Sequence, residues 1–292
     1  MGKSKIKKCF TSRFDGGKIV EMDFSQLEVV GLAFLSNDKV LIEDLREGKD
    51  LHCVNTASLY KTPYDVVVNA YKSGDAMWTD RRKSTKQLSF QLQYGAGATS
   101  MATSSGVDVA TAKRFIDVYY SRYPQVKAWQ DGVAMAIKAS AIPSSRKTKK
   151  GIPAKKGWYV CPVTKRKYTF FEYDAPDFLV DRGQLTSFSP TEMKNYPVQG
   201  FATGDFMAVA SQLLLDCLIN HNLFDKILPI ATIHDSFLFD VKPEVTMHEL
   251  NTIVDVLKNT PQAVSHKWGV PFTLPVGVDV EVGPSWFDTS EL

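Results

Sequence analysis

Alternating stretches near the two ends of the chain constrain its fold more than any other feature. In 18–24 (KIVEMDF), positions 20, 22 and 24 are apolar and Glu21 and Asp23 lie between them, whereas in 274–282 four valines alternate with other residues. A period of two is typical of half-buried strands. The segment 230–241 (IATIHDSFLFDV) predicts two more short strands, hinged at residues 234–236. Strands therefore lie near both ends of the chain.

Helix signals fill the middle of the chain. Aspartates and prolines mark the helix starts, and glycines mark the ends. The predicted helices cover 37–47, 51–60, 63–74, 77–94, a segment capped by Asp108, 124–140, 197–220 and a last helix opened by Pro243. Residues 141–190 have no helical period, so we expect an insertion or loop region carrying a short hairpin. The fold class is therefore α+β: an antiparallel sheet with helices, interrupted by a mainly helical subdomain.

The composition is that of an ordinary globular protein, with 44% hydrophobic and 23% charged residues. The net charge is only +3 and does not by itself indicate a nucleic-acid-binding protein. The cations are unevenly placed, however. A group in the middle of the chain comprises Arg146, Lys147, Lys149, Lys150, Lys155, Lys156, Lys165, Arg166 and Lys167. Two interpretations stay open: a solvated loop, or a flap that contacts phosphates and binds less tightly as salt rises.

The four cysteines, Cys9, Cys53, Cys161 and Cys217, are far apart and have no paired spacing. They are typical of reduced thiols in an intracellular protein, and their pattern does not favour a zinc site. No apolar run approaches the roughly 18–20 residues that span a bilayer, and no signal-type apolar core follows the basic N-terminus. We therefore expect a soluble cytoplasmic protein without membrane association.

Two carboxylates occupy positions suited to phosphoryl-transfer chemistry. Asp23 lies at the end of the first predicted strand, and Asp235 lies at the tip of the predicted hairpin. Two metal ions roughly 3.5–4 Å apart need bridging acidic ligands, and the strand ends of a shared sheet hold such ligands rigidly. An aspartate at a strand end or turn is more often structural. From these residues alone, both interpretations stay open.

A stripe of four side chains marks the segment 81–94 (RRKSTKQLSFQLQY). Arg82, Lys86, Phe90 and Tyr94 recur every four residues, so each is displaced by about 40° around a helix axis from the one before. A nucleoside triphosphate along this stripe would meet cations at its phosphates and aromatic rings at its sugar and base. The alternative is an ordinary amphipathic helix with buried aromatic rings and exposed cations.

Four segments resemble the motifs of family A DNA polymerases, the class of bacterial polymerase I and many phage replicases. Asp23-Phe-Ser-Gln-Leu-Glu28 is similar to motif A, Arg82-x3-Lys86-x3-Phe90-x3-Tyr94-Gly95 to motif B, Asn195-Tyr-Pro-Val-Gln199-Gly200 to the start of a family helix, and His234-Asp235-Ser236 to motif C. The motifs occur in the family's order over nearly the whole chain. The resemblance implies a DNA-directed DNA polymerase, a nucleotidyl transferase that extends a primer on a template during DNA replication.

The resemblance also implies the residues of the site. Two Mg²⁺ ions, for which Mn²⁺ can substitute, would be held by Asp23, the backbone carbonyl of Phe24 and Asp235. The dNTP would be bound by Gln26, Glu28, His52, Arg82, Lys86, Phe90 and Tyr94. The primer-template DNA would be contacted by Gly95, Asn195, Gln199 and His234. Asp23, Asp235 and Lys86 would be the catalytic residues.

Family membership would give the nucleotide-binding side chains distinct roles. Glu28 would lie under the sugar, where a ribose 2′-hydroxyl collides with it. Arg82 and Lys86 would offset the charge that builds on the departing pyrophosphate. Phe90 would stack against the sugar and base, and Tyr94 would occupy the template stacking site before closure. Because some phage relatives carry Tyr in place of Phe90, we expect strong discrimination against dideoxynucleotides.

Ser236 departs from the family pattern, which places Glu directly after the motif C aspartate. Single-subunit RNA polymerases also carry His-Asp-Ser, but Glu28 and Phe90 favour deoxynucleotides. A catalytically inactive nucleic-acid-binding subunit is a second alternative. The presence of both Asp23 and Asp235 argues against it.

The second departure is that only 22 residues precede Asp23. Family members carry a thumb, and usually an exonuclease-type domain, before motif A. We expect both to be absent from this chain, together with the first part of the palm. Two explanations stay open: a second polypeptide of a split phage polymerase supplies them, or the chain is a truncated gene product. The palm would then comprise 1–60 and 191–292, and the fingers would comprise 61–190 with a basic insertion at 141–190.

Overall fold

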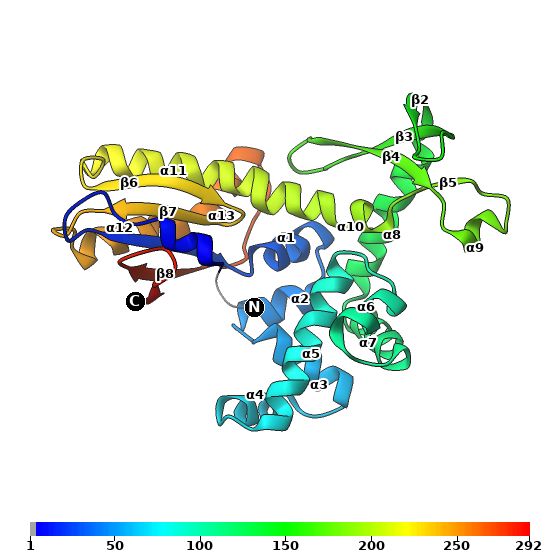
Figure 1. The fold of residues 1–292 in the computed structure, drawn as a ribbon, viewed down its shortest axis with the longest axis horizontal. Helices are drawn as coiled ribbons and strands as arrows, with labels where there is room; N and C mark the ends of the chain where they lie inside the picture. The colour runs from blue at the N-terminus through cyan, green and yellow to red at the C-terminus, as the bar shows by residue number, and fades with distance from the viewer. Residues whose placement is uncertain (1–3) are drawn as a thin grey trace. The chain divides into compact units, whose positions relative to one another are not determined.

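The computed structural model describes residues 4–292 and divides into two compact units (Figure 1). We call the first, Met1–Gly31 with Gln199–Leu292, the sheet unit, and the second, Leu32–Val198, the helical unit. The chain passes between them within α1 (Leu27–Ser36) and again within a long helical run, Pro190–Asn220. The sheet unit is therefore assembled from two distant parts of the sequence.

A five-stranded sheet in the order β6-β7-β1-β8-β9 forms the centre of the sheet unit. Its strands are β1 (Lys18–Ser25), β6 (Ile227–Ile233), β7 (Ser236–Val241), β8 (Gly277–Gly283) and β9 (Ser290–Glu291). β1 pairs antiparallel with β7 on one side and with β8 on the other. The predicted strands near both ends of the chain are therefore confirmed, and they do share one sheet.

Helices cover the apolar side of this sheet. They are η2 (Gly200–Phe206), α11 (Met207–Asn220), α12 (Met247–Lys258) and α13 (Thr260–Trp268), and a short 3₁₀ helix, η1 (Lys5–Cys9), precedes β1. Val20, Met22 and Phe24 of β1 are each at most 1% exposed. Phe24 contacts Phe206 edge to face, with ring centroids 5.3 Å apart. The strand alternation thus leaves Glu21 and Asp23 on the other side of β1.

The last predicted helix starts later than expected and is followed by a second one. We expected Pro243 to open it, but α12 begins at Met247 because Thr246 and Glu249 form a reciprocal capping box. Pro261 lies in the first turn of α13, where its missing N–H costs nothing. The sequence analysis did not predict α13 as a separate helix.

The helical run Pro190–Asn220 joins α10 (Pro190–Gln199), η2 and α11, and it is longer than the predicted 197–220. Within residues 4–292 it alone is long and apolar enough to cross a membrane by length and composition, and half of its most apolar window is buried inside the structure. Pro197 lies inside α10, and the following turns, Gly200–Phe206, are π-helical. A proline removes one backbone donor, and π-helical turns occur frequently at functional sites.

Helices make up most of the helical unit. They are α2 (Lys39–Arg46), α3 (Leu51–Tyr60), α4 (Tyr64–Lys72), α5 (Ala76–Gln93), α6 (Ala98–Ser105), α7 (Val109–Arg122) and α8 (Pro124–Ala139). The predicted range 51–60 is confirmed, the predicted 77–94 differs from α5 by one residue at each end, and the predicted 124–140 differs from α8 by one residue at its C-terminal end. The sequence analysis missed α1 and α6.

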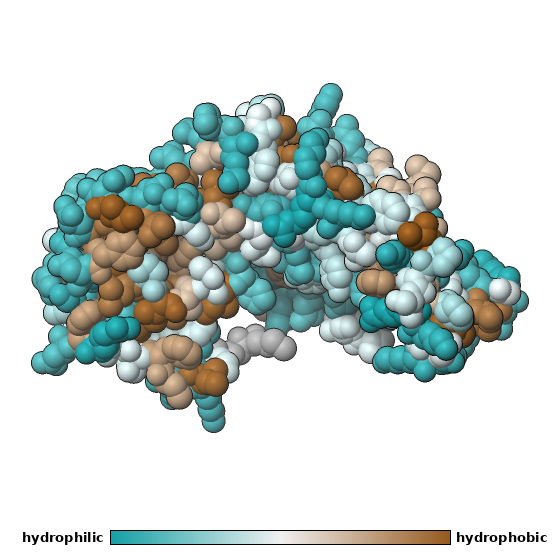
Figure 2. Space-filling view, turned by 90° about the horizontal axis from the view of Figure 1, so that it is seen from above, coloured by the Kyte–Doolittle hydropathy of each residue, from teal (hydrophilic) through white to brown (hydrophobic). Residues whose placement is uncertain are grey.

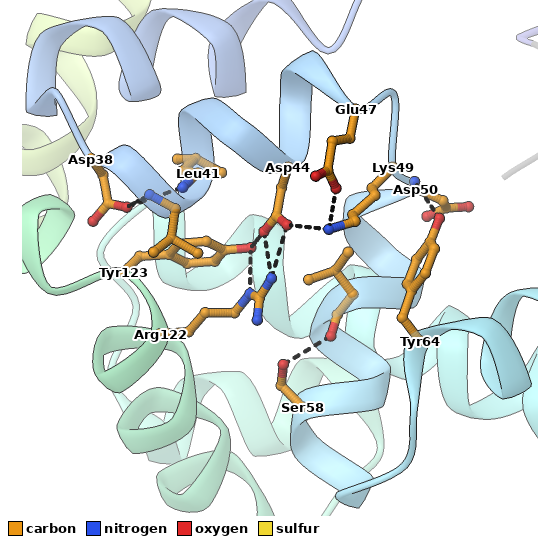
Figure 3. Close-up of polar contacts among 12 residues, drawn as sticks. Asp38, Leu41, Asp44, Glu47, Lys49, Asp50, Ser58, Tyr64, Arg122 and Tyr123 are labelled. Atoms are coloured by element: carbon orange, nitrogen blue, oxygen red, sulfur yellow. Dashed lines mark hydrogen bonds and ion pairs between the residues drawn. The ribbon is translucent and has the colours of Figure 1, made fainter.

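Buried aspartates tie these helices together (Figure 3). Asp38 caps α2 and also accepts hydrogen bonds from the backbone N–H groups of Gln125 and Val126 at the start of α8. Asp44 is 2% exposed and accepts two hydrogen bonds from Arg122, at 2.9 and 2.7 Å, and one from the Tyr123 hydroxyl at 3.0 Å. These contacts fix α2 against α7 and α8.

The basic segment forms an ordered sheet, so the expectation of a loop region with a short hairpin was wrong. Four strands in the order β2-β3-β4-β5 span β2 (Ile142–Lys147), β3 (Pro153–Val160), β4 (Lys167–Asp174) and β5 (Thr186–Phe188), with α9 (Asp177–Val180) between the last two. One face packs on α8, where Phe170 and Phe188 join Val133 and Ile137 in a buried cluster. This core orders the segment despite its many lysines.

Apolar side chains also reach the surface of the sheet unit. In Figure 2 a hydrophobic patch lies on the left of the view, over the part of the molecule that holds α11 and β6. Leu215, Phe224 and Ile230 are 37–42% exposed there and line a cavity of about 480 Å³. β6 is an edge strand with a register shift beside Pro229. A proline at an edge blunts its tendency to pair with another strand.

Candidate active site

Two neighbouring strand ends hold the two predicted metal-ligand aspartates. Asp23 lies near the end of β1, opposite Ser236 of β7 on one side and Asp279 of β8 on the other. Asp235 lies in the tight turn between β6 and β7, and its backbone carbonyl accepts a hydrogen bond from the Phe24 N–H at 3.1 Å. This bond joins the turn to β1 and fixes the backbone on which both aspartates are carried.

A cavity of about 400 Å³ lies over these strand ends. It is lined by Lys7, Glu21, Asp23, Ile233, His234, Asp235, Ser236, Asp279, Glu281 and Trp286. Five of these side chains are carboxylates. The sequence analysis identified two of them and missed Glu21, Asp279 and Glu281. Their signal was present, because acidic residues alternate with valines in 277–283 and Glu21 lies two residues before Asp23 on the same side of the strand.

Burial raises the pKa values of both aspartates, and for Asp23 the neighbouring carboxylates raise the pKa further. The pKa of Asp23 rises to about 7, chiefly because burial disfavours its charged form, and next because Asp235, Glu21, Asp279 and Glu281 repel a further negative charge. Burial also raises the pKa of Asp235. A bound cation would reverse both effects by stabilising the ionised carboxylates.

The donor set fits a hard divalent cation. Mg²⁺ prefers oxygen ligands and commonly binds through one or two carboxylates together with substrate phosphates. Asp23, Asp235 and the carbonyl of Phe24 offer only oxygen atoms. Among residues 4–292 no cluster of three or more His, Cys, Asp or Glu side chains forms a metal cage. A site of two carboxylates therefore agrees with Mg²⁺ better than with Zn²⁺, which takes nitrogen and sulfur ligands in closed sites.

Glu21 lies beside the position at which this chain departs from the family pattern. Its Oε1 accepts a hydrogen bond from the Ser236 hydroxyl at 3.3 Å, and its Oε2 accepts one from the Trp286 indole N–H at 2.8 Å. Lys7 Nζ is 3.8 Å from the same carboxylate. The cavity thus contains a fixed carboxylate next to Ser236, although motif C itself lacks the glutamate.

The start of α1 and the end of α10 bring two other predicted residues together. Glu28 lies in the first turn of α1, and its Oε1 is 3.4 Å from Gln199 Nε2, which donates to it. Gln26 and His234 have positive φ angles, 55° and 56°. A non-glycine residue rarely adopts this conformation, and such residues concentrate at turns and functional sites. These residues all belong to the sheet unit.

Two residues of the stripe on α5 face solvent, Lys86 and Phe90, whereas Arg82 and Tyr94 are half-buried. Phe90 is 38% exposed and Lys86 is also exposed, whereas Trp78, Leu88 and Leu92 are buried on other sides of the helix. Lys86 Nζ lies 5.7 Å from the Phe90 ring centroid. The alternative, in which the aromatic rings form the core of an ordinary amphipathic helix, is therefore wrong for Phe90.

Asp50 binds the first cation of the stripe, which the sequence analysis did not foresee. It caps α3 and accepts hydrogen bonds from Arg82 Nε at 3.0 Å and Nη2 at 2.6 Å. Arg82 also stacks on Tyr71, with its guanidinium carbon 4.3 Å from the ring centroid. Arg82 is thus held in place by α3 and α4.

His52 lies close to both cations and to Phe90. Burial, Lys86 and Arg82 together lower the pKa of His52 to about 4, so its ring is neutral at pH 7. The ring packs against Phe90 with centroids 5.6 Å apart, and its Nδ1 is buried without a hydrogen-bond partner in the described part of the chain. It can therefore donate or accept a hydrogen bond to a ligand but carries no charge.

The end of α5 packs tightly against the start of α10. Tyr94 ends α5, and Gly95 has a φ of +77°. A Cβ atom on Gly95 would lie 2.8 Å from Thr191 Cα. Asn195 lies half-buried on α10. The predicted residues from His52 to Asn195 thus belong to the helical unit, whereas Asp23, Phe24, Gln26, Glu28, Gln199, His234 and Asp235 belong to the sheet unit.

Comparisons with known proteins agree with this picture. DNA polymerase I of Lactococcus lactis is 25% identical over 284 residues, covering 97% of this chain and 27% of that protein. The thermostable DNA polymerase I of Thermus filiformis is 25% identical over 293 residues, covering 98% of this chain and 29% of that protein. The chain therefore spans less than a third of the length of these relatives.

A solved structure has the same fold. It is the POL domain of Pol1 from M. smegmatis in complex with DNA primer-template and dNTP, with a TM-score of 0.66 and 22% sequence identity. The alignment covers 98% of this chain and 44% of that one. The sequence model of DNA polymerase family A matches residues 1–288, nearly the whole chain. The chain belongs to DNA polymerase family A.

Proposed function

We propose that this chain carries out template-directed DNA synthesis, transferring a nucleotide from a dNTP to the 3′ end of a primer. One observation carries the proposal: Asp23 and Asp235, from opposite ends of the sequence, line the same acidic cavity in a member of DNA polymerase family A. Such chemistry depends on positioning and on electrostatic stabilisation rather than on covalent help from the protein.

Two Mg²⁺ ions, or Mn²⁺ in their place, would be held by Asp23, Asp235 and the carbonyl of Phe24. When bound, they would polarise the primer hydroxyl and stabilise the charge that develops on the pyrophosphate. The raised pKa of Asp23 supports this assignment, because ionised carboxylates this close together need a counter-charge. Glu21, fixed by Ser236 and Trp286, would add to the negative potential.

Residues of α3 and α5 would hold the nucleotide. Arg82 and Lys86 would bind the triphosphate, and His52 would contribute a hydrogen bond in its neutral form. Phe90 is exposed at the right place on the stripe to stack against the sugar and base. Tyr94 would occupy the template stacking position. Lys86 would be the catalytic cation, since it is exposed and Arg82 is already paired with Asp50.

Glu28 would select deoxynucleotides by excluding a ribose 2′-hydroxyl. Its contact with Gln199 supports this role, because a hydrogen bond holds the carboxylate in one orientation. Gln199, His234, Asn195 and Gly95 would contact the primer-template, and Gln26 would contact the dNTP. These assignments follow from family membership and from the placement of each residue in its own unit.

We further propose that the palm comprises 1–60 and 191–292 and the fingers 61–190, although the first three residues lie outside the described part. A second polypeptide would supply the thumb, the rest of the palm and an exonuclease function, as part of a phage replicase acting in the host cytoplasm. The chain spans 27% of the length of a curated relative.

Primer extension tests the proposed activity. Purified chain, Mg²⁺ and four dNTPs should extend a primer, and Asp235→Ala should abolish extension while the variant still melts cooperatively. Replacing dNTPs with rNTPs should give little product, whereas preferred use of rNTPs would instead support an RNA polymerase. Folded chain that binds primer-template but does not extend it, with or without an added thumb-bearing subunit, would support an inactive binding subunit.

A further inference from the structure

The sheet β2–β5 has one face against α8 and one face turned away from it (Figure 1). Tyr159 of β3 and Tyr168 and Phe170 of β4 pack in the α8 cluster. A Cβ on Gly157 would come within 2.3 Å of the Ile137 carbonyl oxygen of α8. Because side chains alternate along a strand, the residues between these point away from α8.

We call this second side the outer face, defined by Arg146 of β2, Lys156 and Trp158 of β3, and Lys167 and Phe171 of β4. Lys156 lies directly opposite Phe171 in the β3–β4 register, and Trp158 and Lys167 lie diagonally across it. The outer face is thus built from three neighbouring strands of a packed sheet rather than from a loop.

Cations and aromatic rings alternate on the outer face. Lys167 Nζ lies 4.3 Å from the Trp158 ring centroid, and the Arg146 guanidinium carbon lies 4.8 Å from the Phe171 centroid. Both rings are half-buried, and Arg146 and Lys167 are exposed. Each cation therefore lies over one ring, while each ring keeps part of its surface exposed to solvent.

The basic stretch of sequence that carries this surface contains no acidic residue of its own, although acidic side chains border it. From 142 to 167 the chain has nine Lys or Arg residues and no Asp or Glu, which leaves 26 cations against 32 acids elsewhere. Glu172 and Asp174 follow on β4, but they accept hydrogen bonds from Thr186 and Thr148 and belong to the side of the sheet that packs on α8. At the margin, the Tyr173 hydroxyl donates to Glu192. The strong positive charge is therefore confined to one part of the molecule.

We propose that the outer face binds single-stranded DNA. Single strands expose their bases, which stack on aromatic side chains, while the phosphates bind nearby cations. A duplex would offer phosphates but no free base for Trp158 or Phe171. The identity of the bound strand rests on the proposed function: in a DNA polymerase it would be the unpaired template ahead of the primer.

Binding of a labelled oligothymidine, measured by fluorescence anisotropy over a range of salt, tests the proposal without any catalysis. Trp158→Ala should weaken binding about tenfold, as expected for one lost stacked base, and Trp158→Phe should restore most of it. The double variant Lys156→Ala/Lys167→Ala should reduce the salt slope by about 1.4, because each phosphate contact on a single strand contributes about 0.7.

Matched controls lie in the same unit. Lys113→Ala/Arg114→Ala removes two exposed cations from α7, and Phe178→Ala removes an aromatic side chain that is 61% exposed on α9. Both should leave affinity and salt slope unchanged. Thr169→Glu adds a negative charge at an exposed position opposite Trp158 without removing packing, so it should weaken binding even if Trp158→Ala misfolds.

The same variants separate this inference from the proposed function. Outer-face variants should extend primers normally when the unpaired part of the template is short. When the unpaired part of the template is long, the same variants should extend primers poorly. If the wild-type chain binds oligothymidine but has no polymerase activity, and the outer-face variants lose that binding, the result supports the outer face as a binding site. The same result overturns the proposed function. The inference is overturned if wild-type chain does not bind oligothymidine, or if the control variants weaken binding as much as the outer-face variants.

Discussion

At the scale of single residues, the acidic cavity sets the chemistry that this chain can perform. Five carboxylates from three strands line it, and burial together with mutual repulsion raises the pKa of Asp23 to about 7. At the proposed metal site, a group with such a raised pKa would link cation binding to proton release. A bound cation would also offset the repulsion among these carboxylates.

Asp23→Asn should stabilise the metal-free protein at alkaline pH. A carboxyl with a raised folded-state pKa contributes stability below its unfolded value, 3.8, and this stability is lost as pH rises to about 7. At pH 8 the variant should gain about 1–2 kcal/mol after allowance for solvent screening, and at pH 4 it should gain little. Urea unfolding in EDTA at both values measures this. Asp117→Asn, an exposed carboxylate on α7, is the control, and an equal gain at both pH values would contradict the prediction.

Phe90→Tyr should relax discrimination against dideoxynucleotides. The exposed ring lies on the α5 stripe, and a hydroxyl added there would supply a polar group that Phe lacks. In a competition between ddNTP and dNTP, we expect the incorporation ratio to change at least about tenfold. Phe178→Tyr provides the matched control. Comparable use of both nucleotides by the unchanged chain would refute the assignment of Phe90.

At the scale of elements, contacts made by single residues hold the proposed nucleotide-binding helices in place. Asp50 caps α3 and pairs with Arg82 of α5, while Gly95 lets the end of α5 approach α10 closely. Each contact joins two helices through one residue. Substitutions there should affect the placement of α5 as well as local stability.

Gly95→Ala should destabilise the chain by at least about 2 kcal/mol. The added methyl group would lie 2.8 Å from a backbone atom of Thr191, and the residue would keep a φ of +77°, which costs about 1–2 kcal/mol without glycine. Gly97→Ala is the control, because nothing lies within 4 Å of its Cβ position. Thermal unfolding of both variants measures the difference, and equal effects would contradict the close approach.

Two substitutions of Asp50 should separate its charge from its capping role. Asp50→Asn keeps an oxygen that can accept from the backbone N–H groups of His52 and Cys53, whereas Asp50→Ala does not. We expect Asp50→Ala to be less stable than Asp50→Asn by about 1 kcal/mol. Urea unfolding provides the comparison, and indistinguishable variants would show that the cap contributes little.

The sequence predicted these elements unevenly, for physical reasons. Helix 51–60 and the strand from Lys18 were predictable because a capping aspartate and a strict alternation act locally. The sheet β2–β5 was not, since its strands are stabilised by packing on α8, which local patterns do not reveal. Likewise, motif residues were recognisable from spacing, but the Asp50–Arg82 pair depends on how α3 meets α5.

At the scale of the whole molecule, a thumb-bearing polypeptide should act on processivity rather than on chemistry. The alignment with the solved relative covers 44% of that relative's chain. If the proposed second polypeptide exists, adding it should lengthen products made in one binding event, measured with a trap for free protein, but leave single-nucleotide addition within about twofold. Full processivity of the isolated chain would contradict the split arrangement.

The interrupted sheet also affects the order in which the protein becomes active during synthesis. β1 emerges from the ribosome early, but its partners β7 and β8 follow only after the entire helical unit. Pairing across so long a separation is intrinsically slow and leaves an apolar strand exposed while it waits. The helical unit can therefore fold first, and the acidic cavity is completed only when the last strands have been translated. A nascent chain would thus lack the carboxylates Asp279 and Glu281 of this cavity until β8 has been made.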